Sequence, residues 1–222
     1  MSKEKANTYR LETDRLTIRC YRLEDAPMML KAITGSLDHL RPWMPWAKNP
    51  PADPESAMNI LRSFQEKFYA DEDYFFGIFN KGENELIGST GLHTRVGEQA
   101  REIGYWINVA HVQQGYATEA VSALLKIGFT IENLERIEIR CDPKNLISQK
   151  IPRALGFSNI AVRLNDVMDA EGKPRDTMIW SLLRRDFLHT SLPTFPVRAF
   201  DKTGREISPG QNWAPPNSYL RP

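Results

Sequence analysis

The chain has 222 residues, of which 41% are hydrophobic and 26% charged, an ordinary composition for a globular protein. Its 29 basic and 28 acidic residues give a formal net charge of +1, so no overall field favours binding to nucleic acid or to an anionic membrane. The two cysteines form no CxxC pattern, the four histidines are scattered, and no apolar run reaches the length of a membrane span, so we expect a cytoplasmic protein with reduced thiols and no metal site.

The first 70 residues predict one strand and two helices around an irregular loop. Residues 1–10 are polar, and we expect them to be flexible. Apolar and polar residues alternate in LTIRC, which predicts a strand with one buried face. A helix follows Glu24-Asp25, and a second helix spans about 55–69. Between these helices, the prolines of LRPWMPWAKNPPADP exclude a regular element and predict a loop.

The middle of the chain is typical of a mixed sheet. YFFGIF, ELIGSTGL and EIGYWINV predict an antiparallel meander. A helix to about Asn133, a strand at RIEIRC and a short helix follow, and Gly156 with Phe157 after it is typical of a Schellman-type helix stop. IAVRL and TMIWSLL predict two more strands, which close the domain near Arg185.

The segment 186–222 has a different composition from the rest of the chain. It holds 6 of the 15 prolines and shows no period, yet it is rich in aromatic residues for a disordered tail. The segment is either disordered or an extended arm. We favour an arm that packs on its own domain or on a partner subunit.

The stretch VQQGYATEA places Gly115 just before an apolar helical run. Successive backbone N–H groups at the positive end of a helix can bind phosphate oxygens, and a glycine lets a ligand approach the backbone. Neither GxxxxGK[ST] nor GxGxxG is present, so a P-loop and a dinucleotide-binding site are not supported. Taken alone, the stretch is better explained as a helix that is simply entered through a glycine turn.

The order of motifs resembles the GNAT superfamily of acetyl-CoA-dependent N-acyltransferases. ETDRLTIR, LRPWMPW, EIGYWI, QGYATEA and NLISQKIPRALGF occur in that order, and the resemblance covers about residues 11–185. Within the superfamily, the branch of ribosomal-protein N-terminal acetyltransferases is the most similar. The resemblance implies an α+β fold of three layers, with a mostly antiparallel mixed sheet of six to seven strands flanked by helices.

The resemblance also implies a function and a cofactor site. It predicts transfer of an acetyl group from acetyl-CoA to a primary amine, by direct attack in a ternary complex. The preceding strand would pair with the pantetheine arm near Ile107, whose backbone N–H would polarise the thioester carbonyl. Asn145 would approach the arm. The pyrophosphate would lie on the turn formed by Gln113, Gln114, Gly115, Tyr116, Ala117 and Thr118.

Two side chains are the candidates for proton transfer. By resemblance, Ser148 would protonate the departing thiolate, and Glu102 would accept the proton of the amine through water. The alternatives are a salt-bridged strand residue for Glu102 and a helix-capping or solvent-facing residue for Ser148. Trp43 and Trp46 would close over the acceptor, or would simply pack within their loop. We treat Tyr105 as an aromatic residue of the core.

Three positions depart from the family pattern, and the acceptor stays open. Val112 and Gln113 replace a basic or polar residue and a glycine, and Pro152 requires its helix to be short, kinked or late in starting. A peptide or protein α-amine is favoured as acceptor over a small-molecule amine. A homodimer is possible through the edge strands or the tail. The alternatives to an enzyme are a non-catalytic CoA-binding module for regulation or interaction and a phosphate-binding protein of another class.

Overall fold

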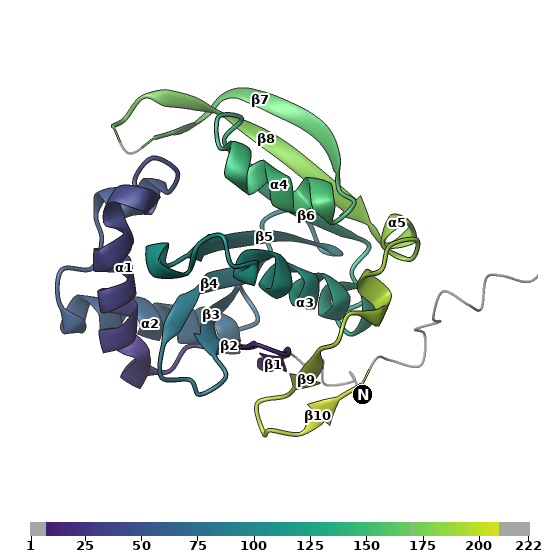
Figure 1. Cartoon of the computed structure of the whole chain (residues 1–222), viewed down its shortest axis with the longest axis horizontal. Coiled ribbons are helices and arrows are strands. Elements are labelled where there is room, and N and C mark those ends of the chain that lie inside the picture. Colours follow the sequence, from purple (N-terminus) through teal and green to yellow (C-terminus); the bar gives the residue numbers. More distant parts are fainter. Residues whose placement is uncertain (1–7, 170, 209–222) are drawn as a thin grey trace, which may run out of the picture.

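The computed structural model describes residues 8–169 and 171–208 (Figure 1). The described residues form one ten-stranded sheet with the order β10-β9-β1-β2-β3-β4-β5-β6-β8-β7. Each neighbouring pair is antiparallel except β5 and β6, which are parallel. The mostly antiparallel mixed sheet predicted from the sequence is therefore confirmed.

The bounds of the elements are close to those expected. The strands are β1 (Arg10–Glu12), β2 (Leu16–Cys20), β3 (Tyr74–Asn80), β4 (Leu86–His93), β5 (Ala100–Ile107), β6 (Arg136–Cys141), β7 (Ser158–Met168), β8 (Pro174–Leu183), β9 (Arg198–Phe200) and β10 (Glu206–Ile207). The α-helices are α1 (Ala26–Leu40), α2 (Pro54–Tyr69), α3 (Tyr116–Thr130), α4 (Leu146–Ala154) and α5 (Arg184–Phe187). Short 3-10 turns are η1 (Leu23–Asp25), η2 (Pro45–Lys48), η3 (Val109–His111) and η4 (Leu192–Thr194).

The expected count of six to seven strands was too low. The seven strands that alternation predicts are β2 to β8. The three that it missed, β1, β9 and β10, have three residues or fewer. Segments this short are too brief to show a period of two, so only their pairing identifies them as strands.

Both ends of the described chain join the sheet. The backbone N–H of Tyr9 donates to the carbonyl of Phe200 at 2.8 Å, and β9 pairs along β1. The expected flexibility of residues 1–10 is therefore wrong for residues 8–10, while residues 1–7 lie outside the described part. The arm expected after Arg185 packs on its own domain, because Phe187 is fully buried against Phe129. Residues 209–222 of that arm lie outside the described residues.

Helices cover both faces of the sheet in three layers (Figure 1). One apolar core joins α3 to β2, β4, β5 and β6, and a second core lies between the other face and α1 with α2. Strand β5 contributes to both, because Tyr105 and Ile107 pack in the first core and Trp106 in the second. Successive side chains of a strand point to opposite faces, so β5 separates two distinct surfaces.

Two proline-rich segments differ from expectation. The loop after α1 contains one regular turn, η2, which begins with Pro45 because a first helical position needs no N–H donor. Pro152 lies inside α4 rather than in its first turn, and α4 is nine residues long. The sequence analysis expected this helix to be short, kinked or late in starting. The helix is short, and it does not start late. It ends as predicted, with Gly156 at φ +84° and the N–H of Phe157 donating to the carbonyl of Pro152.

No described helix is long and apolar enough to cross a membrane.

Candidate functional site

Strands β5 and β6 pair along only half of β5. Their register runs from Ala100 opposite Arg136 to Ile103 opposite Ile139. Beyond that point β5 continues to Ile107 and stays paired with β4 alone. Within the described residues, no strand lies along this second edge of 104–107. The divergence opens a gap in the centre of the sheet.

Backbone groups of β5 face this gap. The N–H of Asn108 donates to the carbonyl of Ile87 in β4, and the carbonyl of Gly104 accepts from the side-chain hydroxyl of Thr90, also in β4. Because backbone N–H groups alternate in direction along a strand, those of Tyr105 and Ile107 point the other way. Ile107, which was predicted to contact the pantetheine arm, therefore lies beside the gap, where an extended ligand could pair with its backbone.

The glycine turn lies where the chain leaves β5 and enters α3. Gly115 is the N-cap residue of α3 and has φ +82°, and Gln113 also lies in the left-handed region at φ +61°. The nearest atom to a side chain built on Gly115 is 3.4 Å away, so conformation rather than crowding requires glycine. No described side chain caps the helix start. The first N–H groups of α3 lack intrahelical partners and are available to an anion.

An arginine that the sequence analysis missed lies against this turn. Arg15 donates to the carbonyl of Gln114 at 2.9 Å, and its guanidinium lies over the ring of Tyr116 at 4.5 Å. The carboxylate of Glu119 holds it there, with an N–O distance of 2.6 Å. Arg15 is separated from the turn by about a hundred residues, so no local pattern pointed to it. Its side chain is 45% exposed and adds positive charge beside the free N–H groups.

Helix α4 brings Asn145 and Ser148 to the same end of the gap. Asn145 is the N-cap, and its side-chain oxygen accepts from the N–H of Ser148 at 3.0 Å. The Asn-x-x-Ser spacing therefore has a capping role in this helix. The hydroxyl of Tyr105 lies 3.1 Å from the Ser148 hydroxyl and donates to the Ser148 carbonyl at 3.2 Å. Tyr105 thus belongs to the site as well as to the core, and burial raises the pKa of its phenol.

Glu102 lies on the opposite face of β5 within a row of charges. Both of its oxygens accept from Arg95, at 2.6 and 2.9 Å, and Arg140 lies 3.4 Å away. Arg140 also contacts Glu138, which pairs in turn with Arg136. The Glu102 side chain is only 6% exposed, whereas Arg95 is 57% exposed. Glu102 is therefore a salt-bridged strand residue, as the alternative interpretation expected, and its role as a base stays a prediction.

The tryptophan loop borders this second face. The rings of Trp46 and Trp106 lie 6.1 Å apart, which places η2 over the end of β5. Arg175, from the β7–β8 hairpin, donates to the carbonyl of Trp43 at 2.9 Å and lies 3.9 Å from Asp142. The hairpin and the loop thus meet across the same face, as Figure 1 shows at their facing tips. The contact with Arg175 was not expected, because 132 residues separate the two partners.

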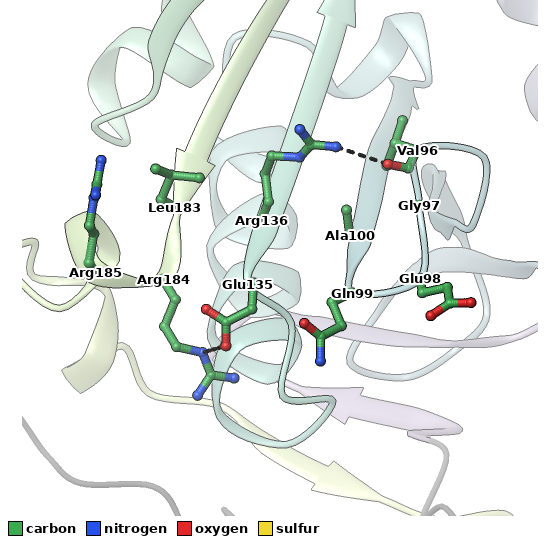
Figure 2. Close-up of a pocket in the computed structure, with 10 residues that line it drawn as sticks. All are labelled: Val96, Gly97, Glu98, Gln99, Ala100, Glu135, Arg136, Leu183, Arg184 and Arg185. Atoms are coloured by element: carbon green, nitrogen blue, oxygen red, sulfur yellow. Dashed lines mark hydrogen bonds and ion pairs between the residues drawn. The ribbon is translucent and has the colours of Figure 1, made fainter.

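A hollow of about 490 Å³ lies at the other end of the sheet (Figure 2). It is bounded by the β4–β5 connection, the start of β6 and the end of β8, and none of the predicted site residues lines it. Two of its arginines serve the fold, since Arg136 donates to the carbonyl of Val96 and Arg184 pairs with Glu135. We therefore place the candidate site at the gap between β5 and β6.

Comparison with known sequences identifies a family. Residues 15–158 match the family model described as an acetyltransferase (GNAT) domain. An N-acetyltransferase of Bacillus licheniformis, p20, is 33% identical over 80% of this chain and 97% of its own length. The alanine N-acetyltransferase of ribosomal protein uS5 from Escherichia coli is 26% identical over 80% of this chain and 92% of its own length.

Comparison with solved structures supports the fold. Mycobacterium smegmatis RimJ, solved in complex with CoA-disulfide, superposes with a TM-score of 0.72 at 21% identity. The match covers 83% of this chain and 90% of that protein. The overall fold is therefore shared with that acetyltransferase.

Proposed function

Since the chain belongs to the GNAT family of acetyltransferases, we propose that it transfers the acetyl group of acetyl-CoA to the α-amine of a peptide or protein. One observation carries the proposal. The same strand, β5, leads from an unpaired edge at Ile107 to the uncapped start of α3 at Gly115. The unpaired edge can hold the carbonyl of a thioester, and the uncapped start of α3 can hold a pyrophosphate.

The residues present fit acetyl-CoA. The N–H groups that follow Gly115, together with Arg15, would hold the pyrophosphate, and Gln113 and Gln114 shape the turn that presents them. The free edge of β5 would pair with the pantetheine arm. When bound, acetyl-CoA supplies an activated acyl group and a thiolate leaving group.

The side chains around the gap divide the chemistry between them. The backbone N–H of Ile107 stabilises negative charge on the carbonyl oxygen, and Ser148 donates a hydrogen bond to the departing sulfur. Glu102 accepts the proton of the amine through water. For this, Arg95, whose side chain is 57% exposed, must release one oxygen of the buried Glu102 carboxylate.

The acceptor approaches from the face that carries Glu102. The Trp46 and Trp106 rings and the hairpin residue Arg175 border that face, and they leave the opposite face to α3 and α4. The relative from Escherichia coli acts on an alanine of ribosomal protein uS5, as its name states. That similarity, over most of both chains, supports a peptide α-amine as the acceptor class.

A two-stage experiment tests the proposal. Calorimetry measures acetyl-CoA binding, and mass spectrometry then follows acetylation of matched peptides with a free or a blocked N-terminus, each containing one lysine. We expect one acetyl group on the free N-terminus and none on the blocked peptide. Absence of acetyl-CoA binding would overturn the cofactor assignment. Acetylation of the blocked peptide would overturn the acceptor class, and binding without transfer would favour a non-catalytic module.

A further inference from the structure

Pro152 changes the hydrogen bonding of Ser148 within α4. In an α-helix, the carbonyl of residue 148 accepts from the N–H of residue 152. Proline has no N–H, and Pro152 lies inside the helix four residues after Ser148. The Ser148 carbonyl therefore lacks its ordinary helical donor at the point where Ser148 faces the gap.

Tyr105 supplies the missing donor from another element. Its hydroxyl reaches the Ser148 carbonyl at 3.2 Å and the Ser148 hydroxyl at 3.1 Å. Tyr105 comes from the half of β5 that does not pair with β6, so the contact joins this part of β5 to α4. The strand thus replaces a hydrogen bond that the helix cannot make.

The two contacts compete for a single proton. A carbonyl can only accept, whereas a hydroxyl can donate or accept, and the phenol has one proton. If Tyr105 donates to the Ser148 carbonyl, its contact with the Ser148 hydroxyl uses the proton of Ser148. If Tyr105 donates to the Ser148 hydroxyl, the proton of Ser148 is free to point elsewhere. The position of the Ser148 proton is therefore set by Tyr105.

We propose that Tyr105 is a positioning residue that directs the hydroxyl proton of Ser148, and that Pro152 creates the competing acceptor. This inference rests on the proposed function, in which Ser148 donates to the departing sulfur. As negative charge develops on sulfur, the Ser148 proton turns to it and Tyr105 donates to the Ser148 oxygen. Burial raises the pKa of Tyr105, so the phenol keeps its proton and can play this part throughout the neutral range.

Removal of the phenol hydroxyl should affect turnover and not binding. In Tyr105→Phe, the Ser148 hydroxyl loses its contact with Tyr105 and can turn to the Cys141 thiol or to the carbonyl of the N-cap residue Asn145. We expect kcat to fall about tenfold, which corresponds to the loss of one hydrogen bond that is stronger in the transition state. The dissociation constant of acetyl-CoA should not change, because the ring remains in place.

The decisive experiment is a double-mutant cycle on kcat. Tyr105→Phe, Ser148→Ala and the double variant are compared, with acetyl-CoA binding measured for each. If Tyr105 acts only through Ser148, the double variant equals Ser148→Ala. Tyr74→Phe is the matched control, since Tyr74 is also a buried strand tyrosine whose hydroxyl bonds to a side chain, that of Asp71. It should retain the wild-type kcat.

Other outcomes separate this inference from the proposed function. Multiplicative losses in the double variant, or an unchanged kcat in Tyr105→Phe beside a lowered kcat in Ser148→Ala, would overturn the role of Tyr105 alone. A wild-type kcat in Ser148→Ala would overturn the role of Ser148 and this inference with it. A second variant, Pro152→Ala, returns the helical N–H. This N–H would occupy the Ser148 carbonyl, which then no longer competes for the proton of Tyr105. We therefore expect kcat to be no lower than in the wild type. A large loss of kcat with intact acetyl-CoA binding would contradict the inference.

Discussion

The two faces of β5 near the gap carry different kinds of polar group. On the side of α3 and α4, the groups that we propose to bind the ligand are backbone N–H groups, and capping or hydroxyl contacts lie nearby. On the side of α1, α2 and the hairpin, the groups are charged side chains such as Glu102 and Arg175, and partners far away in sequence hold them. A substitution can remove a charged side chain directly, but it affects a backbone N–H group only by changing the backbone conformation.

The largest effect should come from the charged face. Glu102→Gln keeps the shape of the side chain but cannot take a proton, so we expect kcat to fall about 100-fold, within the range for general-base catalysis. Steady-state kinetics with a saturating peptide acceptor measures this. Glu138→Gln is the matched control, because Glu138 lies opposite Glu102 in the register, is equally buried and also pairs with Arg140. Equal losses in both variants would show that the charge row serves stability and not proton transfer.

A smaller effect should come from the backbone face. Valine at position 115 must adopt φ +82°, which costs about 1–3 kcal/mol, and relaxation of that strain displaces the helix start. We expect Gly115→Val to weaken acetyl-CoA binding about tenfold by calorimetry. Gly204→Val introduces the same strain at φ +82° in an exposed turn and should leave the affinity unchanged. If both variants bind acetyl-CoA as the wild type does, the turn is not the pyrophosphate site.

The smallest effect should come from the contact between the hairpin and the tryptophan loop. Arg175→Gln removes the donor to the Trp43 carbonyl and loosens the border of the acceptor face. We expect the KM for a peptide acceptor to rise about fivefold, as for the loss of one hydrogen bond, with the KM for acetyl-CoA unchanged. Arg163→Gln, an exposed arginine on the same hairpin, should change neither value. A rise in the KM for acetyl-CoA would mean that the two faces are not separate.

The same comparison explains what the sequence could predict. Seven strands, the start of α3 and the stop after α4 follow from periodicity and from glycine positions, which are local properties. The turn around Gly115 was found for the same reason. Strands β1, β9 and β10 were missed because segments of two or three residues show no period, and their pairing appears only in the structure.

Side-chain partnerships were the part that sequence could not supply. The role of Glu102 as a base stays a prediction, and its ion pair with Arg95, which forms across a strand connection, was not foreseen. The contact of Arg15 with the glycine turn joins segments about a hundred residues apart. The spacing of Asn145 and Ser148 was interpreted as a ligand contact, and the structure gives it a second, capping role. Tyr105 was assigned to the core because only the tertiary structure brings its hydroxyl to α4.

The pairing of β1 with β9 also bears on how the protein is made. The ribosome makes β1 nearly 190 residues before the strand that covers its outer edge, Arg198–Phe200. Until then, β1 can pair only with β2, and its other edge stays open to unwanted partners. The central sheet can therefore assemble during synthesis, whereas the outer edge of β1 is covered only after β9 has been made.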